Sequence, residues 1–172
     1  DYIYESRTEY DIDGKKNFDI KLGGAYAVDL KAYHGEKIEV TMFSNVYKNL
    51  MADYKVKIDD IKNRIDIDLN RFNEASEADA KESLVITIFI PVKYIGKIEL
   101  SVNAGTLNIT DIENEHIEVN GKISEVTLQG NKSEIEIDSN LDMQISVLSH
   151  EGALEINQLS ATSRLTLPAD YR

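Results

Sequence analysis

The sequence predicts an all-β protein: a β-solenoid-like coil with two strands per turn, preceded by an antiparallel sheet or a small sandwich. Three observations predict it. Between residues 98 and 167 an apolar–polar–apolar triplet occurs eight times, at steps of 9 to 11 residues. Before residue 91, several segments alternate apolar and polar residues with the period of two typical of half-buried strands. Eleven of the thirteen Phe and Tyr residues lie before residue 90, so wide inter-sheet spaces give way to a narrow aliphatic interior.

The N-terminal subregion, residues 1–94, contains the alternating segments. The predicted strands are 18–22, 37–43, 55–58, 64–69 and 83–90. The predicted turns are Asp13-Gly14, Gly23-Gly24, His34-Gly35 and Asp59-Asp60. Residues 73–82 are small and charged and predict a mobile loop, and residues 45–52 predict a short helical turn. Pro91 ends the last strand, because proline cannot donate a hydrogen bond to a sheet.

The repeat region, residues 95–172, consists of the eight triplets. The triplets are 98–100, 107–109, 117–119, 126–128, 135–137, 145–147, 154–156 and 165–167. Both flanking positions of every triplet are Ile, Leu or Val, which places them in an aliphatic interior and the middle side chain outside. Glycines in the connecting turns, such as Gly121 and Gly152, are expected where a positive φ is needed.

The middle residues of the triplets alternate between glutamate and a neutral polar residue. With two strands of the coil per turn, one outer face carries a glutamate row and the other carries a neutral row. The glutamate row is Glu99, Glu118, Glu136 and Glu155, and the neutral row is Asn108, Thr127, Ser146 and Thr166. An antiparallel β-sandwich throughout, with consecutive strands assigned alternately to two sheets, stays open as an alternative.

An apolar-Pro-x-x-Tyr pattern occurs before the repeat, at residues 90–94, and again at its end, at residues 167–171. We therefore expect that the natural protein continues past Arg172 into more coil.

Composition excludes several classes of partner. The net charge of −12 and the pI near 4.7 argue against nucleic acid, which requires a basic patch over phosphates. No run of about 18 apolar residues occurs, so no membrane span is predicted within the given chain. Cysteine is absent, which removes disulfides and thiolate chemistry.

No catalytic, cofactor or metal residues are predicted. There is no Gly-x-Ser-x-Gly elbow, the three histidines lie far apart in sequence, and no His-Glu-x-x-His pattern occurs. Neighbouring glutamates of the row would stand near the spacing of a retaining glycosidase pair, but they form a uniform row without nearby aromatic residues. Two interpretations of the row stay open: a solvated face that resists aggregation, or a surface that binds divalent cations weakly or a basic partner.

The strand Ile86–Pro91, with the Gly-x-apolar turns at Gly105, Gly121 and Gly152, resembles the bacterial putative-adhesin family (domain of unknown function 4097) over roughly residues 15–172. The resemblance implies a β-coil with a β-sheet lead-in, placed outside the cell or in the envelope, and supplies no catalytic residues. We expect a non-enzymatic extracellular or cell-envelope module whose extended faces bind an unknown protein or cell-surface partner. The alternatives are a sensor or scaffold domain of an envelope-stress, anti-sigma-type system and a degenerate polysaccharide-active coil.

Overall fold

The computed structural model describes residues 4–12, 17–45, 54–71, 77–158 and 162–170, and about three quarters of them are in strands, which confirms the all-β class. The elements are β1 (Tyr4–Asp11), β2 (Asn17–Tyr33), β3 (Lys37–Ser44), β4 (Tyr54–Ile61), β5 (Arg64–Arg71), α2 (Glu77–Ser83), β6 (Val85–Pro91), β7 (Ile98–Thr110), β8 (Glu113–Gln129), β9 (Asn131–Asp138), β10 (Met143–Val147), β11 (His150–Glu151), β12 (Leu154–Asn157) and β13 (Ser163–Thr166). The predicted turn at Asp13-Gly14 and, apart from Asn45, the predicted helical turn at 45–52 lie outside the described residues.

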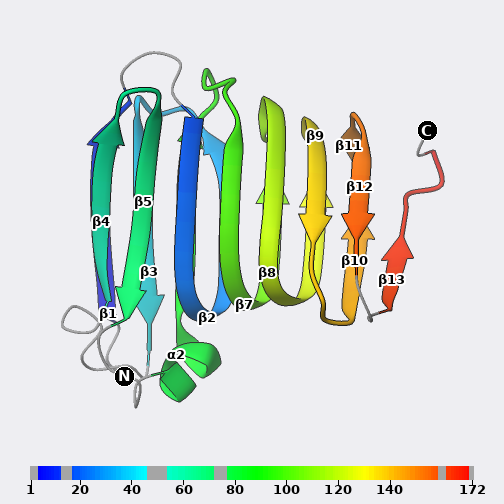
Figure 1. Ribbon diagram of the computed structural model, residues 1–172, viewed down its shortest axis with the longest axis horizontal. Coiled ribbons are helices and arrows are strands. Elements are labelled where there is room, and N and C mark those ends of the chain that lie inside the picture. The colour runs from blue at the N-terminus through cyan, green and yellow to red at the C-terminus, as the bar shows by residue number, and fades with distance from the viewer. Residues whose placement is uncertain (1–3, 13–16, 46–53, 72–76, 159–161, 171–172) are drawn as a thin grey trace.

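The strands form two layers, and β2, β7 and β8 each run through a bend from one layer into the other (Figure 1). Successive turns of the chain pair in parallel, so that Ile98 lies beside Ile117 and Leu107 lies beside Val126. The pairing continues from β8 to β9 and β10, and from these to β12 and β13, at spacings of 18 to 20 residues. The predicted alternative of an antiparallel sandwich throughout is therefore wrong for this region.

The N-terminal strands form a mixed sheet. The β1–β3, β3–β6 and β4–β5 pairs are antiparallel, as predicted. In contrast, β2 pairs in parallel with β5, β6 and β7. The first half of β2 lies between β5 and β7, and its second half lies between β6 and β7. A single long strand thus joins the sheet-rich subregion to the repeat.

Two predicted turns are in fact parts of strands. Gly23-Gly24 lies inside β2, where the register with β7 shifts between Lys21 and Gly24. Glycine here lets the strand bend between the layers without ending it. Asp59-Asp60 lies inside β4, and the turn to β5 falls at Lys62-Asn63, with Ile61 opposite Arg64. Asp59 is therefore a strand residue, exposed on β4 beside Asp66 of β5.

The predicted loop at 73–82 is wrong for its described part, because residues 77–83 form the short helix α2. The helix packs against β2 at one edge of the two layers (Figure 1). Ala80 and Leu84 are completely buried, and the Leu84 carbonyl accepts a hydrogen bond from the Tyr26 amide at 2.8 Å. This segment of small and charged residues is helical because a helix buries Ala80 against the core.

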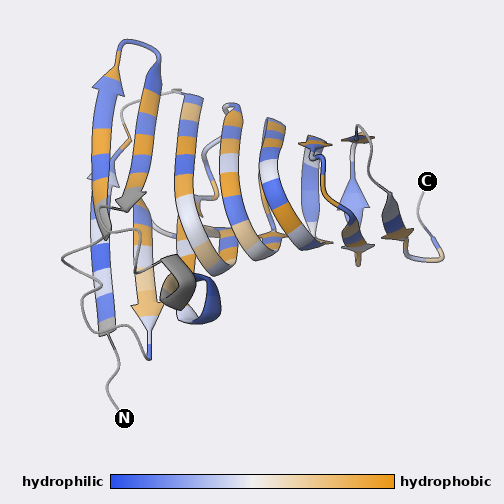
Figure 2. Cartoon of the chain, turned by 60° about the horizontal axis from the view of Figure 1, so that its bottom comes forward, coloured by the Kyte–Doolittle hydropathy of each residue, from blue (hydrophilic) through white to orange (hydrophobic). Residues whose placement is uncertain are grey.

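One hydrophobic core runs between the layers, and apolar and polar residues alternate along the strands that enclose it (Figure 2). The flanking residues of the first six triplets are all buried. Those of the seventh are half-buried, and Leu165 and Leu167 of the eighth are 43% and 41% exposed. The interior is thus closed through β10 and opens towards the last strands.

The junction of the two predicted subregions is tightly packed. The rings of Phe18 and Tyr94 stack with their centroids 4.2 Å apart, and the Tyr94 hydroxyl donates to the Lys97 carbonyl oxygen. Burial of this phenol raises the pKa of Tyr94. Both subregions contribute to the same core, and the division into 1–94 and 95–172 stays a prediction.

Candidate functional site

The four residues of the glutamate row are neighbours across parallel strands. Glu99 is the register partner of Glu118, Glu118 that of Glu136, and Glu136 that of Glu155. Strands in a sheet are about 4.8 Å apart, so these carboxylates project from one outer face at that repeat. The structure therefore brings together residues that are up to 56 positions apart in the chain.

The row continues into the N-terminal strands. Asp19 on β2 is the register partner of Glu99, Asp66 on β5 is that of Asp19, and Asp59 on β4 is that of Asp66. We call the complete set the acidic row: Asp59, Asp66, Asp19, Glu99, Glu118, Glu136 and Glu155. Sequence analysis missed the three aspartates, because nothing local to them indicates that β2 pairs in parallel with both β5 and β7.

The acidic row is neutralised at one end only. Lys57 Nζ lies 3.6 Å from a carboxylate oxygen of Asp59, and Arg64 Nε lies 2.6 Å from one of Asp66. Within the described part of the chain, no ion pair includes the four glutamates of the row. Negative charge therefore accumulates along β7, β8, β9 and β12, where like charges on adjacent strands repel one another.

Glu136 is the most perturbed member of the acidic row. Loss of hydration and the neighbouring carboxylates of Asp138, Glu118 and Glu155 raise its pKa. Its hydrogen-bond donor among the described residues is neutral: Asn157 Nδ2 lies 3.3 Å from Glu136 Oε1 and 2.8 Å from Asp138 Oδ1. A carboxylate at this place is thus held among other carboxylates without a compensating cation in the described residues.

Replacing Glu136 with glutamine is expected to raise the melting temperature at pH 7. A carboxyl whose pKa is raised on folding contributes stability below its unfolded pKa and loses that contribution as pH rises through the folded pKa. Glutamine removes the repulsion, so the gain should be present at pH 7 and disappear at pH 4. Thermal melts at both pH values measure this. Thr127→Ala on the opposite face is the control, and an equal effect of Glu136→Gln at both pH values would contradict the assignment.

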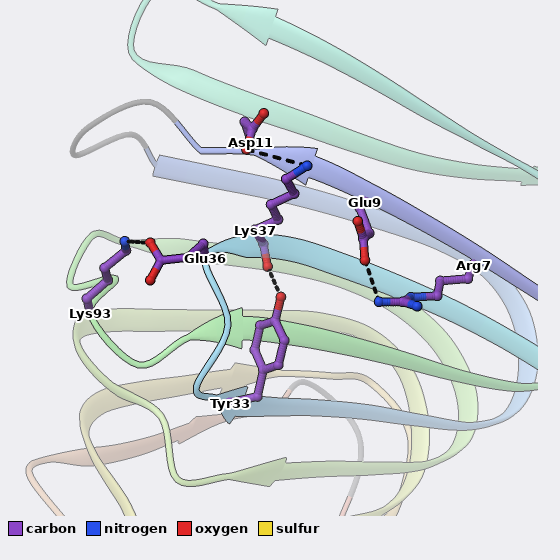
Figure 3. Close-up of polar contacts among 7 residues, drawn as sticks. All are labelled: Arg7, Glu9, Asp11, Tyr33, Glu36, Lys37 and Lys93. Atoms are coloured by element: carbon purple, nitrogen blue, oxygen red, sulfur yellow. Dashed lines mark hydrogen bonds and ion pairs between the residues drawn. The ribbon is translucent and has the colours of Figure 1, made fainter.

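The neutral row is also assembled as predicted. Asn108 is the register partner of Thr127, Thr127 that of Ser146, and Ser146 that of Thr166. Asp29 on β2 extends it by one strand, and Asn108 Nδ2 donates to Asp29 Oδ1 at 2.7 Å. The region beyond the neutral row, towards β1 and β3, carries four ion pairs: Arg7 with Glu9, Arg7 with Glu39, Lys37 with Asp11, and Lys93 with Glu36 (the last two and Arg7–Glu9 are drawn in Figure 3).

Aromatic rings stand beside the neutral row. The rings of Tyr33 on β2 and Phe89 on β6 have centroids 5.3 Å apart, and Lys31 Nζ lies 5.2 Å from the centre of the Phe89 ring. Lys31 is the register partner of both Phe89 and Thr110. Aromatic side chains that are remote from Asn108 and Thr127 in the sequence therefore lie near the neutral row in space.

A shallow hollow of about 390 Å³ borders the acidic row. Its lining includes Glu99 and Glu118 from the row, together with His116, Arg64, Lys97 and Asn17. His116 is the register partner of Glu134, and its Nδ1 lies 3.8 Å from Glu134 Oε2. Sequence analysis treated the histidines as isolated residues, so it missed His116 as a neighbour of the row.

The chain resembles a solved structure throughout its length. A putative cell adhesion protein from Clostridium sporogenes superposes with a TM-score of 0.66 at 9% identity, covering 97% of this chain and 100% of that one. The two proteins share a fold. Putative adhesins from Bacteroides fragilis (TM-score 0.32, 12% identity, covering 95% of this chain and 96% of that one) and Parabacteroides merdae (0.26, 9%, 95% and 95%) are too distant to support an argument.

No protein-family model and no curated protein sequence matches the chain. The fold likeness to a bacterial putative cell adhesion protein agrees with the coarser part of the resemblance noted from the sequence, while membership of the domain family 4097 stays a prediction. In the described residues, no helix has the length and hydrophobicity needed to cross a bilayer.

Proposed function

We propose that this chain is a non-enzymatic module of the bacterial cell surface or envelope that presents its two outer β faces for adhesion or protein interaction. The observation that carries this proposal is the acidic row, with seven carboxylates in register and the last four without an ion pair in the described residues. The fold shared with the Clostridium sporogenes putative cell adhesion protein supports it.

The acidic row suits a basic partner better than a reaction. Catalysis by two carboxylates needs unequal surroundings that separate their pKa values within a cleft that holds substrate. The glutamates of the row instead lie along an outer face of the sheet, where Glu99 and Glu155 are exposed and Glu118 and Glu136 are partly buried. A linear array at the strand spacing complements a partner that presents several Lys or Arg side chains, and such complementarity mainly accelerates association and selects the partner.

The proposal is tested by adhesion of beads coated with the full chain to cells of the source bacterium and to a poly-lysine surface. Glu118, Glu136 and Glu155 are changed together to glutamine, and the matched control changes Asn108, Thr127 and Ser146 to alanine. We expect the glutamine variant to lose roughly tenfold or more of its binding, because each exposed charge pair contributes about 0.2–1 kcal/mol and several act together. Adhesion of the control should equal that of the unchanged chain.

Salt provides a second readout. Binding through the acidic row should weaken between 50 and 500 mM NaCl, since exposed charges are screened over about a Debye length. Adhesion that is unaffected by both the glutamine variant and salt, or that is lost only in the control, would overturn the proposal.

A further inference from the structure

His116, Glu118 and Glu136 meet at one point on the acidic face. One ring nitrogen and one oxygen from each carboxylate all lie within 4.8 Å of one another, and the three side chains are partly buried. Their positions follow from the strands: His116 and Glu118 are alternate residues of β8 and project from the same face, and Glu136 is the register partner of Glu118 on β9.

This ligand set has the chemistry of a divalent transition-metal site. Imidazole nitrogen with carboxylate oxygen suits Zn²⁺ and similar first-row ions, whereas Ca²⁺ and Mg²⁺ prefer oxygen alone. Bonds of about 2.0–2.2 Å to one ion bring ligand atoms to within roughly 3–3.5 Å of each other in a tetrahedral or octahedral arrangement. The observed separation needs only a small movement of flexible glutamate side chains.

The surroundings of the three residues favour an ion. Two glutamates supply the two negative charges that balance a divalent cation, at a place where the described residues supply no ion pair to either of them. Glu134 Oε2 lies 3.8 Å from His116 Nδ1, so a third carboxylate borders the imidazole. His116 and Glu118 also line the hollow of about 390 Å³ described above.

We propose that His116, Glu118 and Glu136 bind one divalent transition-metal ion, with Zn²⁺ as the probe. The site uses the imidazole as well as the row, so it goes beyond an acidic face that attracts cations in general. This proposal and the adhesion proposal can fail separately. Adhesion measured in the presence of EDTA depends on the carboxylates without a bound ion.

The test is isothermal titration of ZnCl₂ into the chelator-treated full chain, followed by the same titration with CaCl₂. We expect one Zn²⁺ per chain and at least tenfold weaker binding of Ca²⁺. His116→Gln, Glu118→Gln and Glu136→Gln should each weaken Zn²⁺ binding by about tenfold or more. Glu99→Gln is the matched control, since Glu99 is also a register partner of Glu118 but lies outside the three, and it should stay within about threefold of the unchanged chain.

Circular dichroism of each variant before titration establishes that it is folded. A Zn²⁺ affinity that is unchanged in His116→Gln would overturn the proposal. So would an equal loss in Glu99→Gln and Glu118→Gln, since that result means diffuse attraction to the acidic row. Zn²⁺ should also raise the melting temperature of the unchanged chain and not that of His116→Gln.

Discussion

Replacement of Gly121 with valine is expected to lower the free energy of unfolding by about 4 kcal/mol or more, one of the largest effects available in this chain. Gly121 lies at the bend of β8 with a φ of 132°, where side chains other than glycine are strained. A Cβ at this position would overlap the carbonyl oxygen of Val102, its register partner on β7. Neither backbone can move away without breaking the parallel ladder between the two turns.

Urea denaturation followed by circular dichroism measures the loss, and the melting temperature should fall by roughly 10 °C. The control is Lys122→Ala, which changes the exposed neighbour in the same bend and should stay within about 0.5 kcal/mol. A Gly121→Val variant as stable as this control would mean that the bend can open without cost. Gly152 has a φ of 108°, and a Cβ there would overlap the carbonyl oxygen of Ser133, so its replacement should behave alike.

Replacement of Asn131 with leucine is expected to cost about 2–5 kcal/mol. The Asn131 side chain is 1% exposed and joins two backbone groups of the preceding turn. Its Oδ1 accepts from the Ile112 amide and its Nδ2 donates to the Ile109 carbonyl oxygen, both at 2.9 Å. Leucine fills the same volume but leaves both backbone groups unpaired in the interior, at about 1–3 kcal/mol each.

Urea denaturation measures the change in the free energy of unfolding. Hydrogen exchange of the Ile112 amide measures the loss of its hydrogen bond. Asn120→Leu is the control, because among the described residues the Asn120 side chain accepts a hydrogen bond from the Ser101 hydroxyl alone, and its replacement should cost less than about 1 kcal/mol. Unchanged protection of the Ile112 amide in Asn131→Leu would show that this amide finds another partner and that the assigned role is wrong.

Both positions show how successive parallel strands are joined where the chain changes layer. Asp111, which has a φ of 58°, and Gly130 lie at the bend beside Asn131. The Asp111 amide donates to the Gln129 carbonyl oxygen, and the Gly130 amide donates to that of Ser149. Backbone hydrogen bonds thus pass from turn to turn at the bends as well as along the strands.

The part of the candidate site that lies within the repeated triplets was predictable from the sequence. Glu99, Glu118, Glu136 and Glu155 occupy the same position in successive turns, so the step of about 19 residues is enough to place them in one row. His116 has a weak local signal, since His116 and Glu118 are two residues apart on a strand. The third residue, Glu136, lies 18 residues after Glu118, a spacing that becomes a contact only when a parallel turn has that length.

The sequence by itself determined the all-β class, the buried flanks of the triplets and the two unlike rows, because alternation along a strand and repetition between turns are local properties. Tertiary structure alone decided that β2 bends through Gly23-Gly24, that residues 77–83 form a helix, and that Asp59, Asp66 and Asp19 extend the acidic row. Those outcomes depend on which strands pair across long stretches of chain. Outside the repeat, parallel pairing is chosen by burial of the whole core rather than by any short segment, so the pairing of β2 with β5 leaves no local pattern.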